Sequence, residues 1–64
     1  MTWELYEVWT EDKIGHQELV DTTKSKKEAQ ALAKKSLDDG FSIAIIYREL
    51  ENGDIEEVER VAAD

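Results

Sequence analysis

One stretch decides the fold: residues 25–40, SKKEAQALAKKSLDDG. Small and apolar side chains recur in it at the spacing of one helical face, namely Ala29, Leu32, Ala33, Ser36 and Leu37. Ser25 is an N-cap residue type with Glu28 three residues later, which is the capping-box spacing. Gly40 can take the positive φ that ends a helix. The pattern predicts a helix over about 26–39, with a shallow apolar face that needs a sheet to cover it.

Two strand-like stretches precede this helix. Residues 3–10 are aromatic and β-branched with charges interleaved, and residues 17–22 form a second, weaker strand pattern. The polar segment between them, roughly Asp12 to His16, is longer than a two-residue turn. These residues predict a first β-hairpin with an extended loop.

Two further strands follow the helix. Residues 41–50 are apolar at most positions, which is typical of a central strand. Asn52-Gly53 is the pair favoured in a type I′ two-residue turn, and residues 54–61 then pair back along the third strand. This turn sets the predicted cross-strand pairs: Tyr47 with Val58, Arg48 with Glu57, and Glu49 with Glu56.

The element order is therefore ββαββ, and it predicts a single small α+β domain over residues 1–64. We expect a four-stranded, mainly antiparallel sheet with one helix packed on one face. Strand order stays open, because the two hairpins could also join through a parallel pair. The hairpins echo each other weakly under a shift of 38 residues, which aligns Trp9 with Tyr47, Glu11 with Glu49, Gly15 with Gly53, Glu18 with Glu56, and Val20 with Val58. A shared plan and chance similarity both explain this echo.

The charge is uneven along the chain. Its 64 residues carry 16 acidic and 8 basic side chains, a net charge of -8. Residues 1–23 and 41–64 each contribute -5, whereas residues 24–40 contribute +2. The sequence therefore predicts a basic helix and acidic hairpins, a polarised field that favours a basic partner over a polyanion. We expect no direct nucleic-acid binding.

Composition also narrows location and chemistry. The chain has no cysteine, which is typical of a reducing compartment, and no run near the roughly 20 apolar residues of a membrane span. The N-terminal residues are strand-like, unlike a signal peptide, so we expect a cytoplasmic protein without membrane association.

The sole imidazole, His16, falls in a predicted loop, and no serine has a triad or nucleophile-elbow context. The acidic segment around Gly53 fails the calcium-loop template, because Arg48 and Leu50 stand at ligand positions. We expect no enzyme, no cofactor and no metal site.

The aromatic residues point to an interaction surface. Alternation along the first strand puts Trp3, Leu5 and Trp9 on one side and Tyr6 and Val8 on the other. Both sides of the third strand are apolar as well, and one short helix can cover only one face. The rest would form an exposed apolar patch, unless glutamate stems cover it. The candidate surface consists of Trp3, Glu4, Glu7, Trp9, Glu18, Tyr47, Glu49, Glu56, Glu57 and Glu59.

Three functions fit this surface. The first is a non-catalytic, acidic protein-interaction module that docks a protein with a basic surface through its sheet. The second is a homodimeric structural or accessory protein that pairs through the apolar sheet face. The third is an inhibitor of phage or mobile-element origin that mimics nucleic acid, with rows of carboxylates in place of phosphates.

Overall fold

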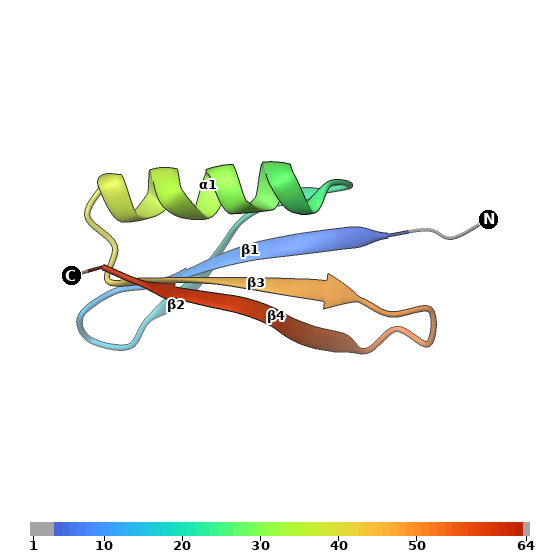
Figure 1. The fold of residues 1–64 in the computed structure, drawn as a ribbon. Helices are drawn as coiled ribbons and strands as arrows, with labels where there is room; N and C mark the ends of the chain where they lie inside the picture. Colours follow the sequence, from blue (N-terminus) through green and yellow to red (C-terminus); the bar gives the residue numbers. More distant parts are fainter. Residues whose placement is uncertain (1–3, 64) are drawn as a thin grey trace.

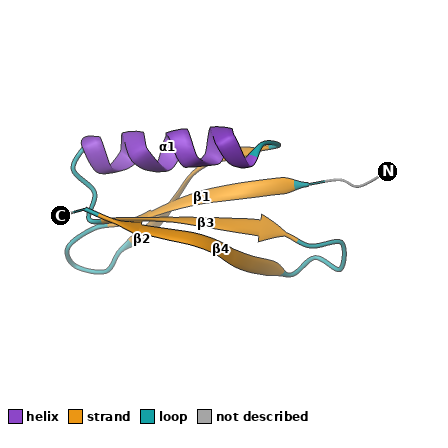
Figure 2. Cartoon of the chain, in the orientation of Figure 1, coloured by secondary structure: helices purple, strands orange, loops and turns teal. Residues whose placement is uncertain are grey.

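The computed structural model describes residues 4–63. Within that range the chain forms four strands and one helix in the order ββαββ (Figures 1 and 2). The elements are β1 (Leu5–Glu11), β2 (Gln17–Thr23), α1 (Lys26–Asp38), β3 (Ile43–Glu49) and β4 (Ile55–Ala62). The first predicted strand was to begin at Trp3, which lies outside the described residues.

The four strands form one open sheet with the order β2-β1-β3-β4, and every neighbouring pair is antiparallel. The hairpins meet through β1 and β3, so the parallel junction left open by the sequence does not occur. Helix α1 lies along one face of the sheet (Figure 1). The predicted α+β fold, with one helix on one face of a four-stranded sheet, is confirmed.

Helix α1 begins and ends where the sequence predicts, but one capping contact differs. Ser25 is the N-cap in an extended conformation, yet its side chain makes no capping hydrogen bond, so the predicted capping box is wrong. At the other end Gly40 has φ 109, its N–H donates to the Leu37 carbonyl at 3.1 Å, and the Phe41 N–H donates to the Ser36 carbonyl at 3.3 Å. These two bonds satisfy the last carbonyls of the helix in a Schellman motif.

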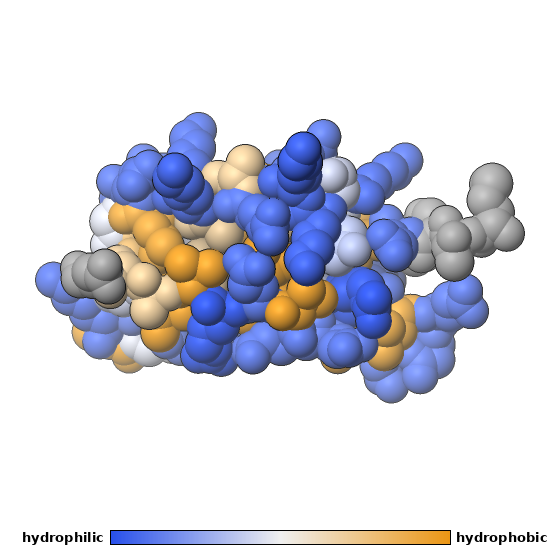
Figure 3. All heavy atoms as spheres, viewed as in Figure 1, coloured by the Kyte–Doolittle hydropathy of each residue, from blue (hydrophilic) through white to orange (hydrophobic). Residues whose placement is uncertain are grey.

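The core lies between α1 and the two central strands. Its buried members are Tyr6, Val8, Ala29, Ala33, Ala44 and Ile46. The alanines face the sheet from the helix, and their small size lets α1 lie close to β1 and β3. Leu32, Leu37 and Val58 pack at the margin of this cluster. Figure 3 shows hydrophobic surface between α1 and β4, mainly toward the left-hand end, with hydrophilic side chains over much of the middle.

Both hairpins close with the same turn, so the type I′ turn predicted at Asn52-Gly53 is wrong. The Gly53 N–H donates to the Leu50 carbonyl at 3.0 Å, as the Gly15 N–H donates to the Asp12 carbonyl at 3.1 Å. Gly53 has φ 91 and Gly15 has φ 87, whereas Asn52 lacks the positive φ that a type I′ turn requires. Each turn therefore has three loop residues and a glycine in the left-handed region.

The same correspondence extends to the strands. The β1–β2 register shifts between Val8 and Trp9, and the β3–β4 register shifts between Ile46 and Tyr47. Under the 38-residue shift these two positions coincide. The weak sequence echo thus has a structural counterpart in both the turns and the bulges, so the hairpins share one plan.

The longer turn changes the predicted register near the second hairpin. Arg48 lies opposite Glu56, not Glu57, and its Nη2 is 3.0 Å from Glu56 Oε2. Glu49 lies opposite Ile55, and Tyr47 lies opposite Glu57. The predicted like-charge pair of Glu49 with Glu56 is therefore avoided, because the extra turn residue moves β4 by one position.

Candidate interaction surface

Helix α1 leaves one face of the sheet uncovered, and we call it the open face. Its membership follows from β1, where Tyr6, Val8 and Thr10 are buried on the helix side and the alternate residues point away. Directly opposite residues share a face. The open face consists of Leu5, Glu7, Trp9 and Glu11 of β1, Ile43, Ile45, Tyr47 and Glu49 of β3, Gln17, Leu19 and Thr22 of β2, and Ile55, Glu57, Arg60 and Ala62 of β4.

An aromatic cluster occupies the middle of the open face. The rings of Trp9 and Tyr47 meet edge to face, with centroids 6.5 Å apart and planes at 90°. Ile45 has 0% exposure although it points away from the helix. Trp9 and Arg60 lie directly opposite it on the two neighbouring strands, and Tyr47 lies two residues along its own strand. The open face thus has a small packed centre of its own.

Carboxylates surround this centre. Glu7 and Glu57 lie directly opposite Tyr47, one on each neighbouring strand. Glu7 Oε1 accepts a hydrogen bond from Trp9 Nε1 at 2.9 Å, which fixes the indole ring. Glu57 Oε1 accepts from Arg60 Nη2 at 3.0 Å. The two glutamates therefore hold one carboxylate on each side of the tyrosine ring.

The Glu57–Arg60 pair depends on the β4 bulge. Residues three apart on a regular strand point to opposite faces. The extra residue at Val58 restores both side chains to the open face, and Val58 itself packs toward the helix-side core. Among the described sheet residues, the open face then carries four carboxylates and this single guanidinium.

The structure divides the predicted surface between two faces. Five of the candidate residues share the open face: Glu7, Trp9, Tyr47, Glu49 and Glu57. Four others have helix-side positions or lie beside them: Glu4, Glu18, Glu56 and Glu59. Trp3 lies outside the described residues. The single acidic surface expected from the sequence is therefore two surfaces with different surroundings.

The helix-side glutamates are engaged with their own neighbours. Glu59 Oε1 accepts from Gln30 Nε2 of α1 at 3.2 Å, and Glu4 Oε2 accepts from the Tyr6 hydroxyl at 3.1 Å. Burial raises the pKa of the Tyr6 phenol, and the hydrogen bond to the Glu4 carboxylate raises it further. Glu59 therefore links the edge strand β4 to α1, whereas Glu4 holds the hydroxyl of a core tyrosine.

Several open-face residues are absent from the predicted surface, and those that matter most for binding are Leu19, Ile55, Glu11 and Arg60. Leu19 and Ile55 are each 49% exposed, so they extend the apolar part of the surface to both edge strands. Parity counting could have found Glu11, which shares the alternation of Glu7 and Trp9. The other three residues follow a turn or a bulge in the chain. Strict alternation of side chains along a strand does not predict where those interruptions fall, so it does not assign these residues to a face.

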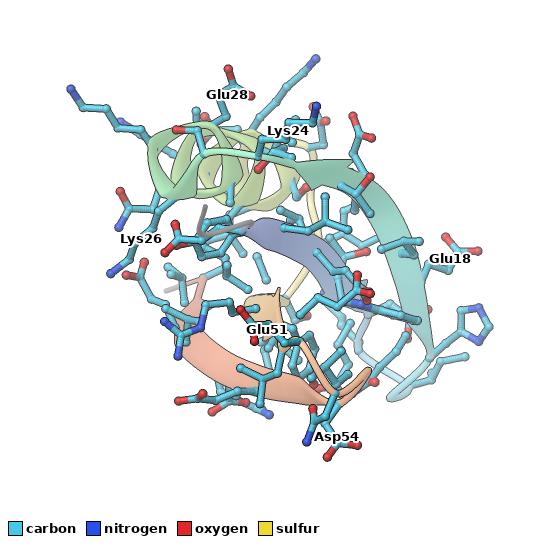
Figure 4. All side chains as sticks on the ribbon, turned by 90° about the vertical axis from the view of Figure 1, so that its right-hand side faces the viewer. Glu18, Lys24, Lys26, Glu28, Glu51 and Asp54 are labelled. Atoms are coloured by element: carbon cyan, nitrogen blue, oxygen red, sulfur yellow. The ribbon has the colours of Figure 1, made fainter. Side chains whose placement is uncertain are left out.

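The segment that contains α1, residues 24–40, carries five lysines and three carboxylates. Lys26, Lys27, Lys34 and Lys35 are all exposed. In Figure 4, Lys24 and Lys26 extend from the beginning of the helix, while Glu51 and Asp54 lie at the β3–β4 turn and Glu18 points outward from the edge of β2. Lysines therefore outnumber carboxylates on the helix, on the opposite side of the molecule from the open face.

A shallow groove of 430 Å³ runs between β2 and α1. It is lined by Asp21, Thr22, Thr23, Glu28, Ala31, Leu32 and Lys35. Asp21 Oδ1 accepts from the Thr22 N–H at 2.8 Å, so a backbone donor of this edge strand is already satisfied within the chain.

Among residues 4–63, no set of three His, Cys, Asp or Glu side chains is placed to hold a metal ion. The helix described here is too short and too polar to cross a membrane.

The fold and this surface define a small ββαββ domain with one uncovered, acidic and aromatic sheet face. Comparisons of the chain with protein-family models, with curated proteins and with solved structures give no match. The function must therefore be argued from the surface itself.

Proposed function

We propose that the protein is a non-catalytic interaction module that docks a basic protein partner on the open face of its sheet. The observation that carries this proposal is the Trp9–Tyr47 pair, half-buried and flanked by Glu7 and Glu57. Aromatic side chains supply contact area at low entropic cost, and the carboxylates select for positive charge. The lack of cysteine fits a reducing compartment, so we place this interaction in the cytoplasm.

Charge also argues for a protein partner over nucleic acid. The carboxylates of the open face are opposed by one guanidinium, which Glu57 already binds. Phosphate groups would meet this face with like charge, and phosphate attraction supplies most non-specific affinity for nucleic acids. Lysine and arginine side chains, in contrast, can stack on the aromatic rings and pair with the glutamates.

Selection of random displayed peptides on the immobilised protein tests the proposal. We expect enriched peptides to combine lysine or arginine with large apolar residues, and their affinity to fall as salt rises. Enrichment of acidic or neutral peptides would contradict the proposal.

Two charge-matched variants separate a specific site from general attraction. Glu7→Gln with Glu49→Gln removes two carboxylates from the open face, whereas Asp38→Asn with Glu51→Gln removes two exposed carboxylates elsewhere. We expect the first variant to bind a selected peptide about tenfold more weakly and the second to bind it almost normally. Equal losses in both variants would show that net charge alone drives the binding.

A further inference from the structure

A stripe of apolar side chains crosses the open face from one edge strand to the other. It takes one residue from each strand in the order Leu19, Trp9, Tyr47 and Ile55, and we call it the diagonal stripe. Leu19 lies directly opposite Trp9, and Trp9 meets Tyr47 edge to face. The residues at its ends, Leu19 and Ile55, are each 49% exposed.

The stripe has the length of a short helix. Neighbouring strands lie about 4.8 Å apart and alternate residues about 6.7 Å apart, so three strand spacings and two residue steps give about 20 Å. A helix rises 1.5 Å per residue, so about 13 residues cover that distance. Helix α1, which covers the other face of the same sheet, has 13 residues.

The backbone chemistry of a sheet face limits what can cover it. The face offers side chains, since the backbone groups of β1 and β3 are paired with their neighbours on both sides. An occupant must therefore bring its own backbone groups already hydrogen-bonded, as a helix or another sheet does. An extended single peptide would lose water from its N–H and C=O groups and gain no partner for them.

The charges on the face favour a basic helix over a second copy of the same sheet face. Glu7 and Glu49 lie on one flank of the stripe, and Glu11 and Glu57 lie on the other. A second copy of the open face would place carboxylates against carboxylates, with only Arg60 of each copy to oppose them. A helix with lysine or arginine on both flanks of an apolar stripe would meet complementary charge on both sides.

We propose that the open face receives a basic amphipathic helix from the partner, with its apolar side on the diagonal stripe and its cationic side chains on the flanking glutamates. This inference rests on the proposed function, and it specifies the form of the basic partner. The recognition mode is that of an amphipathic helix that lays its apolar side on a hydrophobic surface.

Three synthetic peptides of about 14 residues test the inference. The first carries leucine at i, i+3, i+7 and i+10 with lysine and alanine elsewhere. The second has the same composition in an order that spreads the leucines around the helix. The third keeps the leucine pattern and replaces lysine with glutamate. Calorimetry measures affinity, and circular dichroism of the mixture measures helix formation on binding.

We expect the first peptide to bind at least about tenfold more tightly than the second and to gain helix content on binding. We expect no measurable binding of the third peptide. Equal affinity of the first two would overturn the helix inference and leave basic docking intact. If the acidic peptide binds as well as either basic peptide, the proposed function fails too. The two failures are thus distinguishable.

A matched pair of variants locates the binding. Ile55→Ser removes one end of the stripe, and Ile14→Ser makes the same chemical change at a loop residue that is 89% exposed. We expect Ile55→Ser to weaken binding of the first peptide about fivefold and Ile14→Ser to leave it unchanged. Equal affinity in the two variants would contradict the diagonal placement. Sedimentation of the protein alone adds a check, because a dimer abolished by Ile55→Ser would make a second copy the occupant and overturn the proposal.

Discussion

The two faces of the sheet are built from neighbouring residues of the same strands, yet they bury their apolar groups in different ways. Ile46 and Ile45 both have 0% exposure. Ile46 belongs to the cluster that α1 covers, whereas Ile45 is enclosed by side chains of the sheet itself. On the covered face the helix buries the central residue. On the open face the neighbouring side chains bury it, and those side chains stay exposed to a partner.

The largest expected effect comes from truncating these two isoleucines. Ile46→Ala leaves a cavity between two packed layers and should cost about 4 kcal/mol, whereas Ile45→Ala should cost about 2 kcal/mol, because the surrounding side chains can collapse toward solvent. Urea unfolding followed by circular dichroism gives both values.

A domain of this size has a stability on the order of 5 kcal/mol, so Ile46→Ala leaves only about 1 kcal/mol of it. Ile46→Val and Ile45→Val then provide the same comparison at smaller cost, about 1 kcal/mol for Ile46→Val and less for Ile45→Val. If the open-face variant proves as costly as the helix-side one, the two faces do not differ in the way described.

The aromatic pair sharpens the same comparison. In a double-mutant cycle of Trp9→Ala and Tyr47→Ala we expect a coupling free energy of about 1 kcal/mol, typical of edge-to-face rings. The single variants should also lose affinity for a basic helical peptide while they stay folded. A coupling near zero would mean that the rings do not pack together in solution.

The sequence predicted the covered face better than the open one. Helical periodicity identified Ala29 and Ala33, and both are buried against the sheet. These positions depend on local spacing, which a single sequence displays. In the same way Gly40 indicated the end of the helix. Its positive φ depends mainly on the residue type, because glycine takes this conformation without steric cost.

The open face depends on register, and register depends on features that residue types leave ambiguous. Asn52-Gly53 fits both a two-residue and a three-residue turn, and the structure adopts the longer one. The bulge at Val58 then reverses the alternation of the strand, so Glu57 and Arg60 share a face that parity counting would divide. One extra residue in a turn or bulge moves every later side chain to the other face.

The ion pairs give a smaller contrast between the faces. Arg48 pairs with Glu56 on the helix side, and Arg60 pairs with Glu57 on the open face. Both pairs are about half exposed, so Glu56→Gln and Glu57→Gln should each change the free energy of unfolding by less than about 1 kcal/mol. Only Glu57→Gln should weaken binding of a basic peptide. Equal affinity of the two variants for the peptide would show that the open face is not the binding surface.

The smallest effect concerns Tyr6, on the helix side. Because burial raises the pKa of its phenol, the folded state favours the neutral form. This contribution to stability is fully present below the unfolded pKa of about 10 and is lost as pH rises through the folded value. Alkaline absorbance titration should show a late-titrating phenol that Tyr6→Phe removes. If the last phenol to titrate persists in Tyr6→Phe, the assignment is wrong.

The Trp9 indole provides the most direct measurement of the central claim that the open face is the binding surface. Its N–H donates to Glu7 in the middle of that face. The chain has two tryptophans, so the Trp3→Phe variant has only the Trp9 indole. We predict that NMR titration of the ¹⁵N-labelled Trp3→Phe variant with the basic helical peptide shifts the indole N–H resonance progressively. The amide resonance of Lys34, on the exposed side of α1, should not shift. A stationary indole resonance with shifting α1 amides would contradict the account.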